Sequence, residues 1–320
     1  MYYTYAQAQQ IIEEINDRVF DEADFDMEFP YNGTTKVDTM KRYQYVSYNI
    51  VGLDKPQERV MLQDVAPTNY KEGDALTKTP VLYGSLLAVP KELIRALAQV
   101  GPGDAAIAAK IGTYADFQRE MKRTGYWRAD SEAALKYING TSTATKYVGR
   151  TGKALFATNH VTLSNPQTTW GNLTANAALT ETNVDNFITD LNSEIDDRGM
   201  PLPTASSYTI WCSPSLAQDA WKVINTDKKM DSGDNTASHV YSMRDKIKIV
   251  EWKQLDLEFG DTYTGWGINS DRQSVMMKWW EKPYYEKDSD IKKNALIYAM
   301  HEAFAVFHES SRGSVAALPA

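Results

Sequence analysis

The longest helical pattern in this chain is DAAIAAKIGTYADFQREMKRTGYWRADSEAALKYI, from Asp104 to Ile138. It follows the helix-breaking run Gly101-Pro102-Gly103, and Asp104 is a good N-cap residue. An apolar stripe recurs at helical spacing, formed by Ile107, Ile111, Tyr114 and Met121. A helix of about thirty residues is about 45 Å long, more than the diameter of a small domain. The sequence therefore predicts a beam-like helix, with Gly125 as a point of disturbance.

Upstream of this helix the sequence alternates as a long β-hairpin does. Tyr43 to Val51 form the outgoing strand, and the return strand is predicted over Gln57 to Val65. The predicted turn consists of Gly52, Leu53, Asp54, Lys55 and Pro56. A two-stranded hairpin is marginal by itself in water, so it either joins a sheet of its own subunit or lies on another subunit. The alternation leaves both placements open.

Downstream of the long helix, helices and strands follow one another without strict alternation. A helix capped by Thr180 or Thr182 is predicted to end at Gly199, and a second helix follows Ser213 with Pro214 at its first position. The predicted strands are Ser207–Cys212, Lys246–Glu251, Gly265–Asn269, Ser274–Trp280 and Ile291–Phe307. This mixture predicts an α+β protein.

The composition is that of a packed globular protein, with 320 residues of which 42% are hydrophobic and 24% charged. A chain of this length buries about three quarters of the surface that its unfolded form exposes, so it needs no metal or disulfide to hold a core. The single Cys212 forms no intramolecular disulfide and favours a protein made in a reducing cytoplasm. We expect neither a membrane span nor a secretory signal, and hence no membrane partner.

The net charge of −8 is unevenly distributed along the chain. Residues 1–30, called here the acidic segment, hold eight acids and one base and therefore carry −7. The rest of the chain is close to neutral and has no basic stripe for phosphates, which argues against sequence-specific binding of nucleic acid. The acidic segment is either a solvated tail or a part that docks on a partner. Part of this segment is predicted to form an amphipathic helix, because apolar residues recur there at helical spacing: Ala8, Ile11, Ile12, Ile15 and Val19.

No catalytic, cofactor-binding or metal-binding pattern in the sequence has the spacing that its chemistry requires. Gly101 to Ala106 has the letters of a dinucleotide-binding turn, but it follows a helical segment and contains a proline. In a strand, His301 and His308 would lie on opposite faces and not around one metal ion. His160 is a candidate general base without a nucleophile elbow, and Cys212 is typical of a small buried hydrophobe. The sequence therefore predicts no enzyme, no cofactor and no metal site.

The chain instead has the anatomy of an assembly subunit. It contains 19 Tyr and 8 Trp, which contact surfaces favour. An acidic segment, a long hairpin and a beam helix are parts that a compact enzyme would not need.

The order of these parts resembles the major capsid proteins of tailed phages with the Hong Kong 97 fold, and among them the Mu-like major head subunit group. Short motifs over about residues 35 to 310 carry the resemblance. They are Leu82-Tyr83-Gly84, Val89-Pro90-Lys91-Glu92-Leu93, Gly152 to His160, Asn172-Leu173, Arg198 to Pro203, and Trp211 to Leu216 with Ala220.

The resemblance implies an α+β fold of five parts. They are an N-terminal arm (1–34), an E-loop (35–85), a peripheral domain with the spine helix (86–169), an axial domain (170–290), and a return strand with the C-terminus (291–320). In that family the E-loop lies over a neighbouring subunit. The resemblance thus implies an intersubunit contact at the predicted turn: Gly52, Leu53, Asp54, Lys55 and Pro56.

The resemblance also implies a function and a set of partners. The subunit would self-assemble as hexamers and pentamers into an icosahedral shell around double-stranded DNA, which it would contact without sequence specificity. Other expected partners are a separate scaffold or maturation protease, a portal and a decoration protein. The expected location is the virion, with assembly in the host cytoplasm. Covalent cross-linking between subunits is not carried over, because Lys55 is only one lysine among many.

Two alternatives stay open at the level of the sequence. The same fold serves encapsulin-type nanocompartments, which enclose an enzyme instead of DNA. A more remote alternative is a hydrolase that uses His160 or His301.

Overall fold

The computed structural model describes residues 29–53, 70–92, 95, 105–162, 165–196, 199–228, 237–290 and 294–319. The predicted beam is helix α4, which runs from Ala105 to Ile138. Asp104, its predicted N-cap, lies outside the described residues. The helix continues through Gly125, so the expected disturbance is not a break. None of the described helices is long and apolar enough to cross a membrane.

Gly125 is required by close packing and not by a turn. A Cβ atom there would lie 2.5 Å from Oε2 of Glu302 and 3.0 Å from Cγ of Pro283. Real Cβ atoms do not approach other atoms so closely, so the glycine allows the helix backbone to lie against the neighbouring sheet.

That neighbour is a four-stranded sheet of long strands. Its order is β1 (Lys36–Thr39), β11 (Val275–Asp290), β12 (Ala295–His308) and β4 (Val81–Pro90). Strand β1 pairs with β11 in parallel, and the other two pairings are antiparallel. Strand β11 extends ten residues beyond its predicted end at Trp280. Between residues 281 and 288 its side chains are mostly polar or charged and at least partly exposed, so its own sequence does not reveal the strand, which pairs with β12 along its length.

A second sheet forms the body below the beam. Its order is β7 (Leu173–Ala175), β13 (Ser314–Leu318), β10 (Trp266–Ser270), β8 (Tyr208–Cys212) and β9 (Ile247–Glu251). The other elements around it are α2 (Tyr31–Thr34), β5 (His160–Thr162), β6 (Asn165–Trp170), α5 (Glu181–Ser193), α6 (Pro214–Asn225), α7 (His239–Ser242), η2 (Arg244–Lys246) and α8 (Lys253–Phe259). The predicted strands at β8, β9 and β10 are confirmed to within a residue at each end.

The two predicted helices of this body are confirmed, with one correction. Thr180 caps α5 and accepts a hydrogen bond from the Asn183 backbone N–H. Helix α6 begins at Pro214 after Ser213. The predicted end of the first helix at Gly199 is wrong, because the backbone turns extended at Glu194. The Glu194 carboxylate instead accepts hydrogen bonds from the Gly313 N–H, at 2.9 and 3.0 Å.

The long hairpin exists, but its pairing differs from the prediction. Strand β2 (Tyr45–Leu53) pairs with β3 (Tyr70–Lys78), and Leu53 lies opposite Tyr70. Gly52 and Leu53 therefore belong to a strand and not to the turn. The register shifts between Ile50 and Leu53, which indicates a β-bulge near Gly52. Glycine inside a strand commonly occurs at such bulges as well as at turns.

The rest of the predicted tip and return strand is not among the described residues. Asp54, Lys55 and Pro56 lie outside them, and so does the predicted return strand Gln57–Val65.

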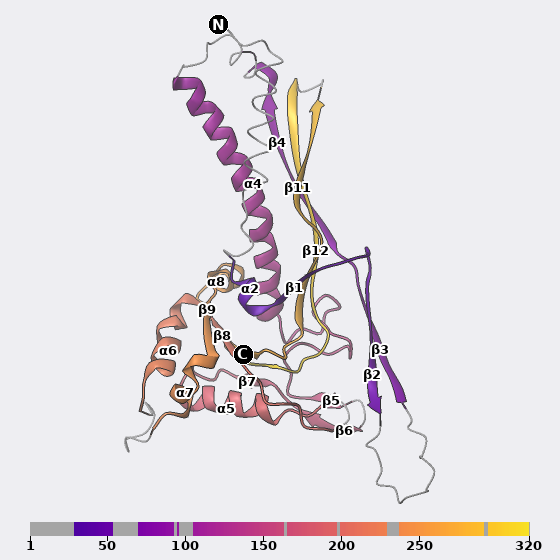
Figure 1. Cartoon of the computed structure of the whole chain (residues 1–320), viewed down its shortest axis with the longest axis vertical. Helices are drawn as coiled ribbons and strands as arrows, with labels where there is room; N and C mark the ends of the chain where they lie inside the picture. Colours follow the sequence, from indigo (N-terminus) through magenta and orange to yellow (C-terminus); the bar gives the residue numbers. More distant parts are fainter. Residues whose placement is uncertain are drawn as a thin grey trace, which may run out of the picture.

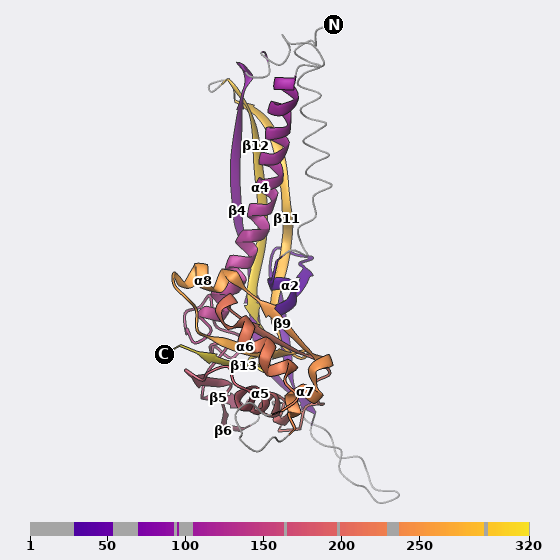
Figure 2. The same cartoon turned by 90° about the vertical axis from the view of Figure 1, so that its left-hand side faces the viewer.

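The arrangement has three parts. Helix α4 runs beside β4, β11 and β12 as a tall extension, and the hairpin β2–β3 projects from the other end (Figure 1). The five-stranded sheet and helices α5 to α7 form the compact part at the base of α4 (Figures 1 and 2).

The largest core cluster lies where these parts meet. Tyr137 near the end of α4 packs on Trp211 of the five-stranded sheet, with ring centroids 4.9 Å apart. Its hydroxyl donates to the Thr34 carbonyl at 2.6 Å and accepts from Asn269 Nδ2 at 2.7 Å. Trp279 and Phe304 of the long sheet belong to the same cluster. Both sheets and the base of the beam therefore share one core.

Candidate assembly surfaces

The root of the hairpin is fixed to the long sheet by one aromatic ring and one arginine. The Tyr45 ring lies 5.0 Å from that of Phe307, and its hydroxyl donates to the Glu309 carboxylate. Arg150, whose side chain is almost buried, donates to Ser47 Oγ at 2.6 Å and lies 3.7 Å from Glu309 Oε1. A buried, charge-assisted contact of this kind holds β2 in one orientation.

The second strand of the hairpin is fixed from the other side. Leu76 of β3 is buried in a small cluster with Ala305 and Phe307 of β12. Lys78 donates to the backbone carbonyls of Thr145 and Val148, at 3.2 and 3.3 Å. The hairpin is therefore held at its root on both strands.

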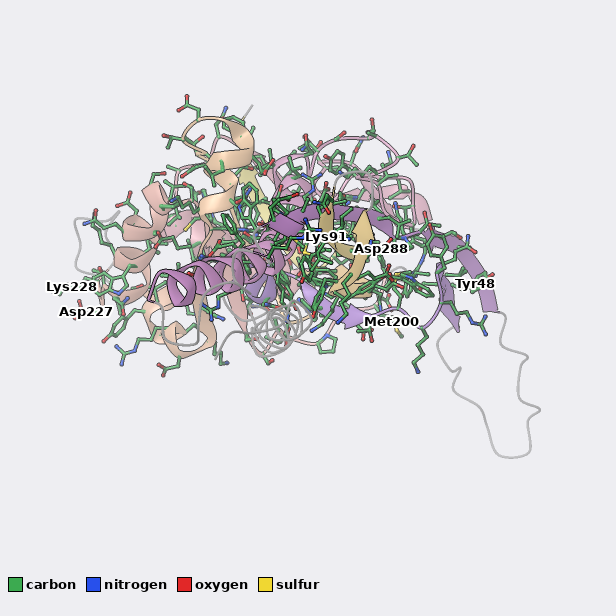
Figure 3. All side chains as sticks on the ribbon, turned by 90° about the horizontal axis from the view of Figure 1, so that it is seen from above. Tyr48, Lys91, Met200, Asp227, Lys228 and Asp288 are labelled. Atoms are coloured by element: carbon green, nitrogen blue, oxygen red, sulfur yellow. The ribbon has the colours of Figure 1, made fainter. Side chains whose placement is uncertain are left out.

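Beyond its root the hairpin presents large side chains to solvent. Tyr48 is 75% exposed, and Val46 is exposed beside it. Figure 3 shows Tyr48 on the projecting strands, apart from the bulk of the molecule. Before the root, Tyr43 is half exposed and meets the Trp280 ring edge to face, with ring centroids 5.7 Å apart. Exposed aromatic and apolar side chains on a rigidly rooted projection mark a contact surface.

Strand β4 supplies a second surface, along the edge of the long sheet. It is the last strand in the sheet order, and β12 is its one neighbour among the described strands. Val81, Leu82 and Leu86 are exposed on it, and Leu82 is 64% exposed. An exposed apolar edge strand is a template for contact with another chain.

Two carboxyl groups are buried where α4 meets the rest of the molecule. Asp130 accepts hydrogen bonds from the Tyr31 N–H at 3.1 Å and the Trp252 indole N–H at 3.0 Å. Glu302 lies on β12 beneath Gly125 and is 2% exposed. Burial raises the pKa of each group to about 7. Both carboxyls therefore change protonation near neutral pH and serve packing and orientation in the interior.

The histidines singled out in the sequence have structural surroundings. His160 begins β5, is buried, and shares a 2.9 Å hydrogen bond with Asn172 Oδ1. Burial lowers its pKa, so it is held neutral. His308 is fully buried, whereas the ring of His301 stands 5.7 Å from that of Tyr284. His160 is thus a hydrogen-bonded interior histidine, whereas the buried ring nitrogens of His308 have no hydrogen-bond partner among the described residues.

The other candidate positions divide into a buried cysteine and undescribed residues. Cys212 is buried, and burial raises the pKa of its thiol to about 12, which makes it inert. Gly101 to Asp104, the core of the dinucleotide-like run, lies outside the described residues. Within the described ranges, no three His, Cys, Asp or Glu side chains come together as a metal-binding group.

The sequence did not single out the residues that organise these surfaces. Arg150 lies in a polar stretch and Glu302 beside His301, so neither has a local pattern. The sequence did contain one sign of a charged face near the end of α4. Arg128, Glu132 and Lys136 follow one another at i, i+4 spacing and therefore share a helix face.

Comparison with known proteins rests on structure, because no family model and no curated protein matches the sequence. The capsid of an empty GTA particle matches with a TM-score of 0.50 at 11% identity, covering 91% of this chain and 89% of that chain. The mature capsid of bacteriophage PhiM1 matches with a TM-score of 0.50 at 12% identity, covering 90% and 86%. The chain therefore has the Hong Kong 97-type fold of phage capsid subunits.

Proposed function

We propose that this chain is a major capsid protein, a structural and not a catalytic subunit that assembles into a closed shell. The observation that carries the proposal is the likeness to two capsid subunits over about nine tenths of each chain. The two exposed surfaces, on the hairpin and on the β4 edge, support it. A head-to-tail contact between repeated subunits joins two different surfaces of each subunit, and such contacts close into rings when the rotation allows it.

In this proposal the hairpin acts as the E-loop and lies on a neighbouring subunit. Gly52 and Leu53 end its described part and, with Asp54, Lys55 and Pro56, are the proposed tip contact. The division into arm (1–34), E-loop (35–85), peripheral domain (86–169), axial domain (170–290) and return strand (291–320) also stays a proposal. So does membership of the Mu-like group, which rests on short motifs alone.

The shell would consist of hexamers and pentamers around double-stranded DNA, in a virion assembled in the host cytoplasm. The near-neutral charge of residues 31–320 suits a wall that does not hold phosphates tightly. A scaffold or maturation protease, a portal and a decoration protein are the further partners we propose. Terminase and portal genes beside this gene would support the phage role, and an adjacent cargo-enzyme gene would favour a nanocompartment.

The proposal is tested at Tyr48. We expect Tyr48→Asp to give a folded chain that forms no shells, because it places a charge on the proposed contact face. Tyr48→Phe, which keeps the apolar area, is the matched control and should assemble. Negative-stain electron microscopy and circular dichroism of both variants provide the readout. Normal shells from the aspartate variant would overturn the proposed role of the hairpin.

A further inference from the structure

A cavity lies where the hairpin, the end of α4 and the long sheet meet. Its volume is about 210 Å³. Lys78 and Val81 line it from the hairpin root and β4, Lys136 from α4, and Lys146 from the loop that follows. Val81 is half exposed, so the cavity reaches the surface along the β4 edge. We call it the lysine cavity.

The lysine cavity holds more positive than negative charge. Glu132 is the one carboxylate among its lining residues, and it is already shared by two cations. Lys146 Nζ lies 2.5 Å from Glu132 Oε2, and an Arg128 guanidinium nitrogen lies 2.7 Å from Oε1. Lys78 and Lys136 form no ion pair with any carboxylate of the described residues, Glu132 included.

The two remaining ammonium groups are satisfied only by neutral oxygens. Lys136, which is 1% exposed, donates to the Tyr147 carbonyl at 2.6 Å. Lys78 donates to the Thr145 and Val148 carbonyls. Burying an ammonium group without a counter-ion costs several kcal/mol, so an anion in the cavity would offset the cost. Burial and the two neighbouring lysines lower the pKa of Lys136 to about 7, which reflects the same imbalance.

The shape of the cavity selects a side chain as the source of that anion. Tyr83, Tyr147 and Phe304 add aromatic walls to the lysines. A carboxylate on a short apolar stem matches a pocket that is lined by lysines together with aromatic and apolar side chains. The volume suffices for one such side chain.

The chain carries its excess of carboxylates in the acidic segment, residues 1–30, which holds −7 of the net −8. The described chain that follows this segment leads away from the cavity. Tyr31 is bound to Asp130, and β1 lies at the edge of the long sheet opposite to β4. The cavity opens along the β4 edge, which is proposed as a contact surface between copies, so the acidic segment of a neighbouring copy is the occupant that we consider.

From this charge complementarity we infer that the lysine cavity binds an acidic side chain from the acidic segment of a second copy of this chain. The inference rests on the proposed function, since it needs copies packed side by side. It assigns Lys78 and Lys136 to an intersubunit contact at the root of the hairpin. Replacing the acids of the segment by amides should weaken the contact as much as replacing the lysines.

The test is photo-cross-linking in assembled protein, with Val81 replaced by photoreactive benzoylphenylalanine. We expect covalent dimers on a denaturing gel, with mass spectrometry locating the partner site in residues 1–30. Lys78→Met should reduce the dimer yield roughly tenfold or more, the effect of removing one partner of a buried charge pair. Lys253→Met, at an exposed lysine on α8, is the control and should leave the yield unchanged.

Lys136→Met removes the deepest charge, and circular dichroism must show that this variant folds. If Lys136→Met does not fold, the variant with amides in place of the acids of residues 1–30 serves instead. It leaves the cavity unchanged and should also reduce the yield of cross-linked dimers.

The outcomes separate this inference from the proposed function. Shells with dimers cross-linked to residues 1–30 support both. Shells without such cross-links overturn the inference alone and favour a free anion such as phosphate in the cavity. Cross-links from position 81 to residues 1–30 of the same chain overturn the inference too, because the cavity then binds the acidic segment of its own chain and not that of a second copy. Absence of shells contradicts the proposed function as well.

Discussion

Glu302 links the stability of the fold to pH. Its folded pKa of about 7 lies above the unfolded value of 4.5, because its carboxyl is buried under Gly125. The folded state therefore binds more protons between these values, and this group's contribution to stability is lost as pH rises through 7. The shift corresponds to up to about 3 kcal/mol.

We therefore predict that Glu302→Gln stabilises the protein at pH 8 relative to wild type and has little effect at pH 5. Thermal or urea unfolding at the two pH values measures the difference. The pKa of Asp130 is raised as well, but this residue is present in both proteins, so its contribution cancels in the difference between their stabilities. An equal effect of the substitution at both pH values would contradict the account.

Gly125 is predicted to be irreplaceable even by alanine. Alanine gains about 1 kcal/mol of helix propensity over glycine. Its Cβ would, however, meet Oε2 of Glu302 and Cγ of Pro283, so the Glu302 carboxyl, which is 2% exposed, would have to shift within the packed interior. We expect Gly125→Ala to lower the free energy of unfolding by about 1–3 kcal/mol.

The control for this substitution is Thr124→Ala, at the adjacent exposed position of α4, which should change stability by less than about 0.5 kcal/mol. A stabilised Gly125→Ala protein would show that the helix does not lie as close to the sheet as described.

At the scale of elements, the hairpin depends on its root. Arg150→Ala removes the contacts to Ser47 and Glu309. We predict faster hydrogen–deuterium exchange in β2 and β3, while β11 and β12 keep their protection, because low local stability raises exchange. Arg244→Ala, at a half-exposed arginine of η2, is the control. Unchanged exchange in the hairpin would mean that Arg150 does not anchor it.

The existence and the starts of elements with local signals were predicted from the sequence, whereas the end of α5 was placed too late. Helices α4, α5 and α6 have capping residues or apolar stripes, and β8 and β10 are short buried runs. The hairpin register and the length of β11 were not predictable, because both depend on pairing with distant strands. The sequence around Gly52 is compatible with either a turn or a β-bulge, and only the pairing of β2 with β3 distinguishes the two.

The candidate surfaces were predicted only in outline. A contact at the hairpin was expected from the resemblance, whereas the lysine cavity was not. Lys78, Lys136 and Lys146 come from a strand, a helix and a loop, and each alone is typical of a solvated surface lysine. Only tertiary structure brings them together.

For the molecule as a whole, the proposed assembly gives its parts a common explanation. A beam and a long sheet extend from a shared core, a hairpin projects from the other end, and apolar side chains are exposed on the projection and the sheet edge. A protein that acted as a monomer would gain nothing from this exposure. Modest contacts are sufficient in a closed lattice, because each subunit is held by several neighbours at once.

Whether this chain builds shells is decided by negative-stain electron microscopy of the purified protein, with its mass in solution measured in parallel. We expect closed particles or tubes many subunits across. A uniform population of 36.1 kDa monomers, still monomeric with crowding agent or a scaffold protein, would contradict it.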